Sequence, residues 1–223
     1  MNKSLLALQK SLHSEINAAR LRIVLASSSP RRREALAAML GGEEYFDIVV
    51  SAFEELLPHS DFASAIDYCL ATARGKAIDV CAKLAQEQRK TLVIAADTVV
   101  ALHDHILEKP ASTVDATRML RMLSGTEHAI HTCVLVYELP TAKEAFAFTT
   151  TTLIKFAQLT DEDIAAYIAT GEAMDKAGAY AIQGTGRLLV ESIDGNFFNA
   201  VGFPAREFAL PFANMLEEIL SLN

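Results

Sequence analysis

Residues 22–36 constrain the fold more than any other stretch, because they predict a strand, a tight turn and a helix in direct succession. The mostly apolar residues 22–26 are typical of a short buried strand, and three serines then end it. Pro30 suits the first position of a helix, where its missing N–H would have no partner within the helix. Ser29 before it is the expected N-cap, with its hydroxyl accepting a hydrogen bond from a first-turn N–H. The segment therefore predicts a βα unit.

Three arginines follow directly, in the first turn of this helix, where the helix dipole favours Asp and Glu. Each misplaced cation costs about 0.3–1 kcal/mol unless an anion lies among them. Free N–H groups, serine hydroxyls and guanidinium groups together make a phosphate site. We therefore expect Ser27, Arg31 and Arg32 to bind a phosphate-bearing substrate, and Arg33 to lie in solvent. The alternative for the whole cluster is an ordinary basic helix end.

The composition sets limits on the class of protein. The chain has 223 residues, 51% hydrophobic and 22% charged, which is enough apolar material for one large domain or two lobes. A net charge of −8 is opposite to the basic stripe of a nucleic-acid binder. No apolar run approaches the roughly 18–20 residues of a membrane helix. The three cysteines lack metal-like spacing, which indicates reduced thiols. We expect a cytoplasmic protein with no nucleic-acid or membrane partner.

Two acidic positions are candidates for chemistry. Asp97 lies inside the apolar run 91–100, which predicts a buried strand. An unpaired buried carboxylate costs several kcal/mol, so Asp97 must be paired, bound to a metal or placed at an exposed strand end. Glu55 follows a short predicted strand over 46–50, and open α/β sheets bind ligands at such strand ends. Carboxylates beside phosphates commonly hold Mg²⁺. A structural Asp that caps a turn is the alternative for Asp97.

Two lysines belong to the same group of candidates. Lys76 lies on a predicted helix over 61–88, off its apolar face, and Lys109 precedes the rigid Pro110. A single helical lysine is usually solvated, which is the alternative for Lys76. Both would act as point charges beside a polyphosphate.

The remaining segments predict alternating helices and strands. Residues 1–20 carry leucines at helical spacing and predict an N-terminal helix, docked or loose. Further helices are expected over 113–123, over 160–170 and from 204 onward, and strands over 128–138, 144–157, 187–193 and 196–201. We expect the last two strands to form a pair around the turn Asp194-Gly195.

Taken together, these segments resemble the Maf family of nucleotide pyrophosphatases. The matching motifs are Ala-Ser-Ser-Ser-Pro-Arg-Arg at 26–32, Glu-Glu at 54–55, Lys-Ala at 76–77, Ala-Asp-Thr-Val-Val at 96–100, Glu-Lys-Pro at 108–110, Leu-Ser-Gly at 123–125 and Asp-Lys-Ala-Gly-Ala-Tyr-Ala-Ile-Gln-Gly at 175–184. Gly-Phe-Pro at 202–204 corresponds to a Gly-Leu-Pro that the family usually carries. The resemblance implies a Maf-like domain over 21–223, with residues 1–20 as an N-terminal extension outside the family core.

The resemblance also implies a fold and an activity. The family fold is a two-lobed α/β structure with a long bent mixed sheet, flanking helices and a cleft, similar to the inosine-triphosphate pyrophosphatases. The family hydrolyses nucleoside triphosphates to the monophosphate and pyrophosphate with a divalent cation, Mg²⁺ or Mn²⁺, and homodimers are common. The Ala-Ile-Gln-Gly form of residues 181–184 resembles the subgroup that cleaves dTTP and UTP, and modified pyrimidine nucleotides would undergo the same chemistry.

Residue roles carried over from the family are as follows. Asp97 is the proton acceptor. Substrate selection falls on Arg31, Thr98 and Gln183, and polar site positions on Glu55, Lys76 and Lys109. Glu55 and Asp97 would hold the metal, and whether Asp97 acts as base, as metal ligand or as both is open. An alternative function is a nucleotide-binding regulator of cell division that does not turn its ligand over.

Overall fold

The computed structural model describes residues 4–55, 57–103 and 105–221. It contains a seven-stranded mixed sheet in the order β2-β1-β3-β5-β6-β7, with β4 paired to β3. The strands are β1 Leu21–Leu25, β2 Asp47–Ile48, β3 Lys90–Leu102, β4 His105–Leu107, β5 Glu127–Leu139, β6 Lys143–Phe156 and β7 Val190–Asp194. The α-helices are α1 Leu5–Asn17, α2 Pro30–Leu40, α3 Ala65–Lys83, α4 Thr113–Leu123, α5 Asp161–Ala169, α6 Phe197–Val201 and α7 Ala205–Ser221. Short 3-10 turns are η1 Glu43–Tyr45, η2 His59–Asp61, η3 Ala177–Ala179 and η4 Gly184–Leu189.

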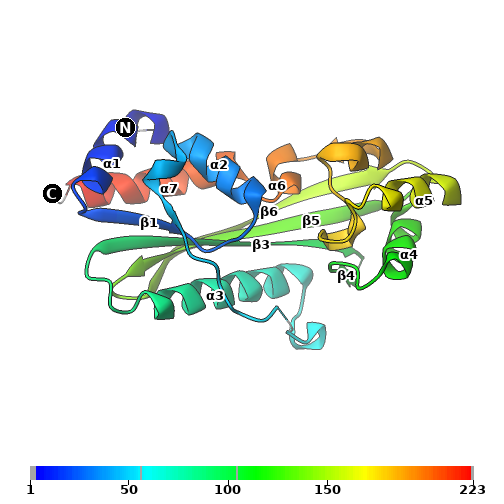
Figure 1. Cartoon of the computed structure of the whole chain (residues 1–223), viewed down its shortest axis with the longest axis horizontal. Coiled ribbons are helices and arrows are strands. Elements are labelled where there is room, and N and C mark those ends of the chain that lie inside the picture. Colours follow the sequence, from blue (N-terminus) through cyan, green and yellow to red (C-terminus); the bar gives the residue numbers. More distant parts are fainter. Residues whose placement is uncertain (1–3, 56, 104, 222–223) are drawn as a thin grey trace.

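Three long strands run the length of the molecule and join two lobes (Figure 1). Strands β3 and β5 have 13 residues each and β6 has 14, so each reaches about 45 Å at the usual rise per residue. One lobe holds α1, α2 and α7 on one face of the sheet and α3 on the other, and the second lobe holds α4, α5, η3 and η4. The two-lobed α/β architecture expected from the sequence is confirmed.

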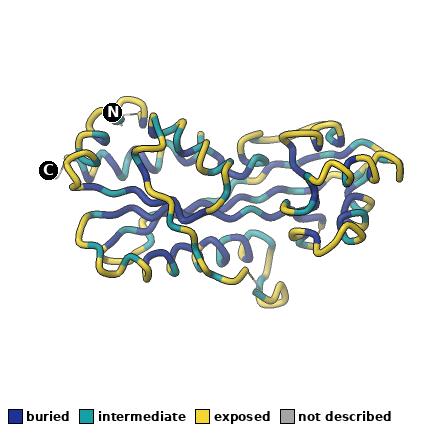
Figure 2. Tube along the Cα trace, viewed as in Figure 1, coloured by how far each residue is buried: buried dark blue, intermediate teal, exposed yellow. Residues whose placement is uncertain are grey.

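Alternation along β3 divides the interior between the two faces of the sheet. Leu92, Ile94 and Ala96 join the core beneath α1, α2 and α7. Val93, Ala95 and Val99 join the core that α3 covers. Successive side chains of a strand point to opposite faces, so Asp97 faces α3 and Thr98 faces α2. The tube in Figure 2 is dark blue along the central strands, as expected for a strand covered on both faces.

One edge of β3 is interrupted in its middle. Strand β5 pairs with the other edge from Thr91 to Ala101. On the interrupted edge, β1 pairs in parallel with residues 90–94, and β4 pairs antiparallel with residues 100–102. Among the described residues, no strand covers residues 95–99 on that edge. We call this interval the notch; it contains Asp97, and the chain leaves β1 beside it.

Most predicted elements form within a few residues of their expected bounds, and α4 forms over the expected range. The helix expected over 61–88 is shorter, because the Ser64 side chain caps it at Asp67 N and it ends at Lys83. The strand expected over 46–50 contains only two residues. Ser29 occupies the N-cap position of α2, but its side chain makes no cap hydrogen bond, contrary to expectation.

The prediction of a strand over 196–201 is wrong. Residues 197–201 form α6, because the Asn196 side chain accepts hydrogen bonds from the N–H groups of Phe198 and Asn199 and so starts a helix. The strand expected before it is present as β7, which pairs with the end of β6.

The N-terminal helix α1 is docked on the body of the protein. Leu5, Leu8 and Leu12 are buried in the core that α7 also covers. None of the helices within the described residues is both long enough and apolar enough to cross a membrane.

Candidate active site

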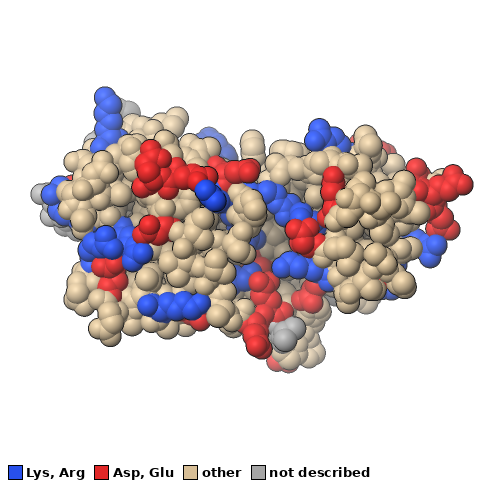
Figure 3. Space-filling view, viewed as in Figure 1, with Lys and Arg blue, Asp and Glu red and all other residues tan. Residues whose placement is uncertain are grey.

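A cleft of about 410 Å³ opens at the notch, between the two lobes. One end of it is polar and is formed by residues 27–31 with Glu55, Lys76, Asp97 and Lys109. The end at the second lobe carries the charged Asp175 and Lys176 beside apolar residues from the core of that lobe, which are Val100, Ile130, Tyr180, Ile182, Ala200 and Val201. In Figure 3, Lys and Arg side chains gather with a few acidic ones around the hollow in the middle of the visible face. A polar end and an end with apolar residues suit a ligand that carries both phosphate and an aromatic base.

The polar end is built around a buried lysine. Lys76 Nζ lies 2.7 Å from Asp97 Oδ1 and 2.9 Å from Glu55 Oε1. Lys76 and Asp97 are only 8% and 6% exposed, so the solvated state that was the alternative for Lys76 is excluded. Lys76 faces the sheet because it lies on the buried side of α3, next to Ala77 and one turn from Ala73 and Val80. The ion pair between Lys76 and Asp97 explains why β3 tolerates a buried carboxylate, because an ammonium group from the facing helix neutralises its charge.

Glu55 completes this charge cluster from the loop after β2. Burial alone would raise the pKa of Glu55, but the Lys76 ammonium, with Lys109 and Arg32 further away, outweighs burial and holds that pKa below its ordinary value. Glu55 is therefore a carboxylate throughout the neutral range. Lys109 is exposed and lines both the cleft and a neighbouring cavity of about 370 Å³ on the α3 side.

The residues present fit a divalent cation only when substrate phosphates supply some of its ligands. Within the described part of the chain, no group of three or more His, Cys, Asp or Glu side chains converges as a metal site would require. Asp97 and Glu55 do converge, since both carboxylates contact Lys76 Nζ. Mg²⁺ is commonly held by one or two carboxylates together with the phosphates of a substrate. The pair therefore fits a cation that arrives with a triphosphate, rather than one held by protein ligands alone.

Arg31 and Arg32 are neighbours in sequence but have different surroundings. Arg31 lines the cleft and is half-buried, and among the described residues it forms no hydrogen bond or ion pair. Burial and the Arg32 charge lower the pKa of Arg31, while Asp175 and Glu34 partly offset them. An unpaired, half-buried guanidinium group at a helix N-terminus is suited to a phosphate.

The guanidinium group of Arg32 instead donates hydrogen bonds to acceptors within the protein. Its Nε donates to Gly202 O at 3.1 Å, Nη1 donates to Ala96 O at 2.9 Å, and Nη2 donates to Thr98 Oγ1 at 2.9 Å. Nη1 also lies 3.5 Å from Ser27 Oγ. This leaves no pair of parallel N–H groups for a bidentate phosphate contact, although Arg32 lines the cleft, so a substrate contact through a single donor stays a prediction.

Three other expected site residues have mixed outcomes. Ser27 is buried in the cleft lining, and its Oγ accepts from Ser29 N at 3.2 Å. Thr98 is half-buried and lines the cleft. Gln183 is exposed and lies outside the lining, because Ile182 packs inward and the next side chain turns to solvent. Arg33, expected in solvent, is exposed but ion-paired with Glu43.

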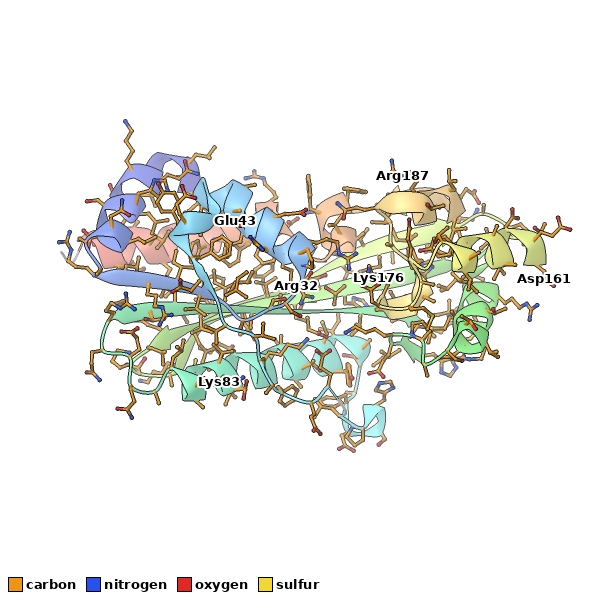
Figure 4. The ribbon with its side chains drawn as sticks, viewed as in Figure 1. Arg32, Glu43, Lys83, Asp161, Lys176 and Arg187 are labelled. Atoms are coloured by element: carbon orange, nitrogen blue, oxygen red, sulfur yellow. The ribbon has the colours of Figure 1, made fainter. Side chains whose placement is uncertain are left out.

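Sequence reasoning missed Lys176 and the segment 200–202. Lys176 lines the cleft from the second lobe, pairs with Asp175 and lies across from Arg32 (Figure 4). Its motif was visible in the sequence, but no role was assigned to it. Gly178, at φ +68°, lets this segment approach β3: a Cβ there would lie 3.0–3.1 Å from the Val100 side chain. Residues 200–202 were missed because they were expected to end a strand.

Comparison with known proteins gives the following matches. The human "Probable bifunctional dTTP/UTP pyrophosphatase/methyltransferase protein" is 42% identical over 196 residues, which cover 84% of this chain and 31% of that protein. This chain thus spans about a third of the length of the human relative. The dTTP/UTP pyrophosphatase of Clostridium botulinum strain Okra is 42% identical over 183 residues, which cover 82% of this chain and 91% of the relative.

Among solved structures, a HAM1 protein from Coxiella burnetii matches with a TM-score of 0.47 and 15% identity, covering 89% of this chain and 99% of that one. A family model described as Maf-like protein matches residues 22–217. Because this match and the 42% identical relatives extend over most of the sequence, the chain belongs to the Maf family.

Proposed function

We propose that this chain is a pyrophosphatase that converts dTTP and UTP to the nucleoside monophosphate and pyrophosphate. The observation that carries the proposal is the buried Lys76, which joins Asp97 and Glu55 at the polar end of a cleft whose other end carries apolar residues. Membership of the Maf family and relatives named dTTP/UTP pyrophosphatase support the choice of substrate.

The reaction is attack of water on the α-phosphorus. A new P–O bond forms to the water oxygen, the bridging P–O bond to the β-phosphate breaks, and pyrophosphate leaves with the electron pair. Asp97 accepts the proton of the attacking water, and its contact with Lys76 fixes the orientation of the carboxylate. Arg31 and Lys109 bind the phosphates and offset their charge, with Lys176 as a further cation at the cleft.

A divalent cation, Mg²⁺ or Mn²⁺, would be held by Glu55 and Asp97 together with the phosphates. When bound, it would supply charge neutralisation on the triphosphate. Lys76 limits how many cations the pair accepts, because its own charge already balances one of the two carboxylates.

A nucleotide panel with separate detection of pyrophosphate and orthophosphate tests the proposal. We expect pyrophosphate from dTTP and UTP, much less from ATP and GTP, and loss of release when EDTA removes the metal. Release of orthophosphate would mean cleavage at the γ-phosphate and would overturn the assigned reaction. Tight binding of dTTP with no product would favour the nucleotide-binding regulator instead.

We also propose a cytoplasmic homodimer. The cysteines Cys69, Cys81 and Cys133 are free and buried, which supports a reducing compartment. Light scattering coupled to size exclusion tests the oligomeric state, and a mass of one chain would contradict the dimer.

A further inference from the structure

A chain of hydrogen bonds leads from Arg32 of α2 across the adjacent strands β3 and β5 to α6 on the same face of the sheet. Arg32 Nη2 donates to Thr98 Oγ1 at 2.9 Å, and Thr98 Oγ1 lies 3.0 Å from Thr132 Oγ1. Thr132 Oγ1 in turn donates to Asn199 O at 3.2 Å. Arg32 belongs to α2, Thr98 and Thr132 to the adjacent strands β3 and β5, and Asn199 to α6. The chain thus connects four elements behind the cleft.

The three hydrogen bonds of this chain form together in only one arrangement of protons. A guanidinium group can only donate and a backbone carbonyl can only accept. Thr132 therefore gives its single hydroxyl proton to Asn199 O and must accept from Thr98. Thr98 in turn gives its proton to Thr132 and accepts from Arg32. Its hydroxyl then has no proton left for the cleft that Thr98 lines, and a lone pair is its one remaining hydrogen-bonding group.

The Thr98 hydroxyl lies close to the end of α6 in the lining of the cleft. Thr98 and Gly202 both line the cleft, and a Cβ added at Gly202 would lie 3.6 Å from Thr98 Oγ1. The same Gly202 carbonyl accepts from Arg32 Nε, so one guanidinium group holds both the hydroxyl and the end of α6. Asn199 holds the rest of α6, since its Nδ2 donates to Ile130 O at 3.1 Å and to Thr152 Oγ1 at 2.9 Å.

We propose that Arg32 and Thr132 are positioning residues that fix Thr98 as a pure hydrogen-bond acceptor toward the base, and so select bases with an imide N–H. Uracil and thymine carry such a donor at N3, whereas cytosine carries a lone pair at the same position and would face the lone pair of Thr98. The inference rests on the proposed function, because it concerns how the same cleft distinguishes pyrimidine nucleotides.

Thr132→Val is the sharpest test, because Thr132 is fully buried and does not line the cleft. Valine has nearly the same shape but no hydroxyl, so the Thr98 proton loses its acceptor and can turn into the cleft. Calorimetric binding of UMP and CMP requires no turnover. We expect the preference of the wild-type protein for UMP over CMP to fall about tenfold in the variant, the change expected when one uncharged hydrogen bond is lost and an opposing one is gained.

Arg32→Lys provides a second, independent variant, with Arg33→Lys as its matched control on the same helix. A lysine keeps the charge but cannot bridge three acceptors, so the UMP preference should fall in Arg32→Lys and stay in Arg33→Lys, where the side chain meets Glu43 outside the cleft. Binding of inorganic pyrophosphate separates this role from phosphate binding. We expect it to change less than about threefold, since Arg32 has no free pair of donors.

Thr98→Ser compared with Thr98→Val completes the set: serine should keep the preference and valine should lose it. The proposal is overturned if Thr132→Val, folded by circular dichroism, retains the UMP preference, or if Arg32→Lys loses pyrophosphate binding in proportion to UMP binding. A wild-type protein that binds UMP and CMP equally also overturns it. Failure of the proposed function would look different, as UMP preference without pyrophosphate release from UTP.

Discussion

Charge placement at single residues leaves cationic groups for the proposed triphosphate in the cleft of a protein with a net charge of −8. Lys76 balances a buried carboxylate that would otherwise cost several kcal/mol. Arg31 has no such partner among the described residues and faces the cleft. Lys76 is thus neutralised within the protein, whereas Arg31 and Lys109 form no ion pair among the described residues and remain free for a ligand in the cleft.

The role of Asp97 is tested by Asp97→Asn. The amide keeps the size of the side chain but cannot accept the proton of water, so kcat should fall by at least about 100-fold, the low end for acid–base catalysis. Steady-state kinetics and thermal melting measure both effects. Glu54→Gln, at an exposed position beside Glu55, is the control and should keep kcat. Normal kcat with normal melting in Asp97→Asn would make Asp97 a structural residue.

The unpaired state of Arg31 is tested by Arg31→Glu. Glutamate suits the first turn of a helix, so the unfolding free energy of the ligand-free protein should stay equal or rise by up to about 1 kcal/mol. The same change sets a negative charge against the phosphates and should nearly abolish binding of a non-hydrolysable dTTP analogue. Differential scanning calorimetry with and without the analogue measures both. A loss of several kcal/mol in the free protein would show that Arg31 holds a carboxylate.

At the scale of elements, the cleft exists because β1 and β4 pair with separate parts of the same edge of β3 and leave residues 95–99 between them without a strand neighbour among the described residues. Strand β1 ends at Leu25, and after the hydrogen bond from Ala26 N to Ile94 O the chain turns into the serine-rich loop. The notch therefore opens at the carboxyl end of β1, where open α/β sheets bind ligands. Its position depends on β1 staying in register with the start of β3.

An ion-pair cluster at the far end of β1 supports this register. Arg22 donates to Asp47 of β2 at 2.7 Å and to Glu87 at 2.9 Å, and Arg89 donates to Glu87 at 2.8 Å. These hydrogen bonds lower the pKa of Glu87 to about 2. The largest contribution comes from the Arg89 side chain, and the Arg89 backbone N–H and the Arg22 side chain add to it. Two guanidinium groups, one from β1 and one from the residue before β3, thus meet at the Glu87 carboxylate.

Glu87→Gln should accordingly destabilise the protein in a pH-dependent way. The pKa of Glu87 is lower in the folded state, so its stabilising effect is complete above the ordinary glutamate pKa and is lost as the pH falls from there toward 2. The melting temperature of the variant should lie below that of the wild-type protein at pH 7, and the gap should close as the pH approaches 2. A gap that is constant with pH would contradict an electrostatic origin.

At the scale of the whole molecule, α1 adds to the core although it precedes the matched residues 22–217. Its side chains also reach the end of α2: Gln9 Nε2 donates to Met39 O at 2.9 Å, and His13 Nε2 lies 2.7 Å from Leu40 O. These contacts satisfy carbonyl groups that the last turn of a helix leaves free. Helix α1 thus stabilises the lobe that carries Arg31 and Arg32 in the first turn of α2.

The docking of α1 predicts opposite outcomes for two leucines of the same helix. Leu12 is fully buried and Leu6 is 74% exposed. Leu12→Ala should lower the free energy of unfolding by about 2–5 kcal/mol, and Leu6→Ala should change it by less than about 0.5 kcal/mol. Urea denaturation measures both values. Equal effects of the two substitutions would mean that α1 is not docked in solution.

The sequence by itself determined the elements and the family. Caps, glycines and apolar periodicity act over a few residues, which is why α4 and the strands β3, β5 and β6 lie close to their expected bounds. A carboxylate inside an apolar run was also enough to single out Asp97, because burying a charge demands a partner wherever the chain folds. The membership of the Maf family, inferred from the order of short motifs, is confirmed.

The tertiary structure decided which of two adjacent arginine side chains keeps its donors free in the cleft. Arg31 and Arg32 are equivalent in sequence, yet the acceptors of Arg32 lie 64, 66 and 170 residues away, and no local pattern encodes where such distant groups meet. Gln183 and Ile182 were separated in the same way, by the packing of the second lobe. Local preferences fix what forms, whereas the donors and acceptors of the cleft are paired by long-range packing, and only the folded chain brings those partners together.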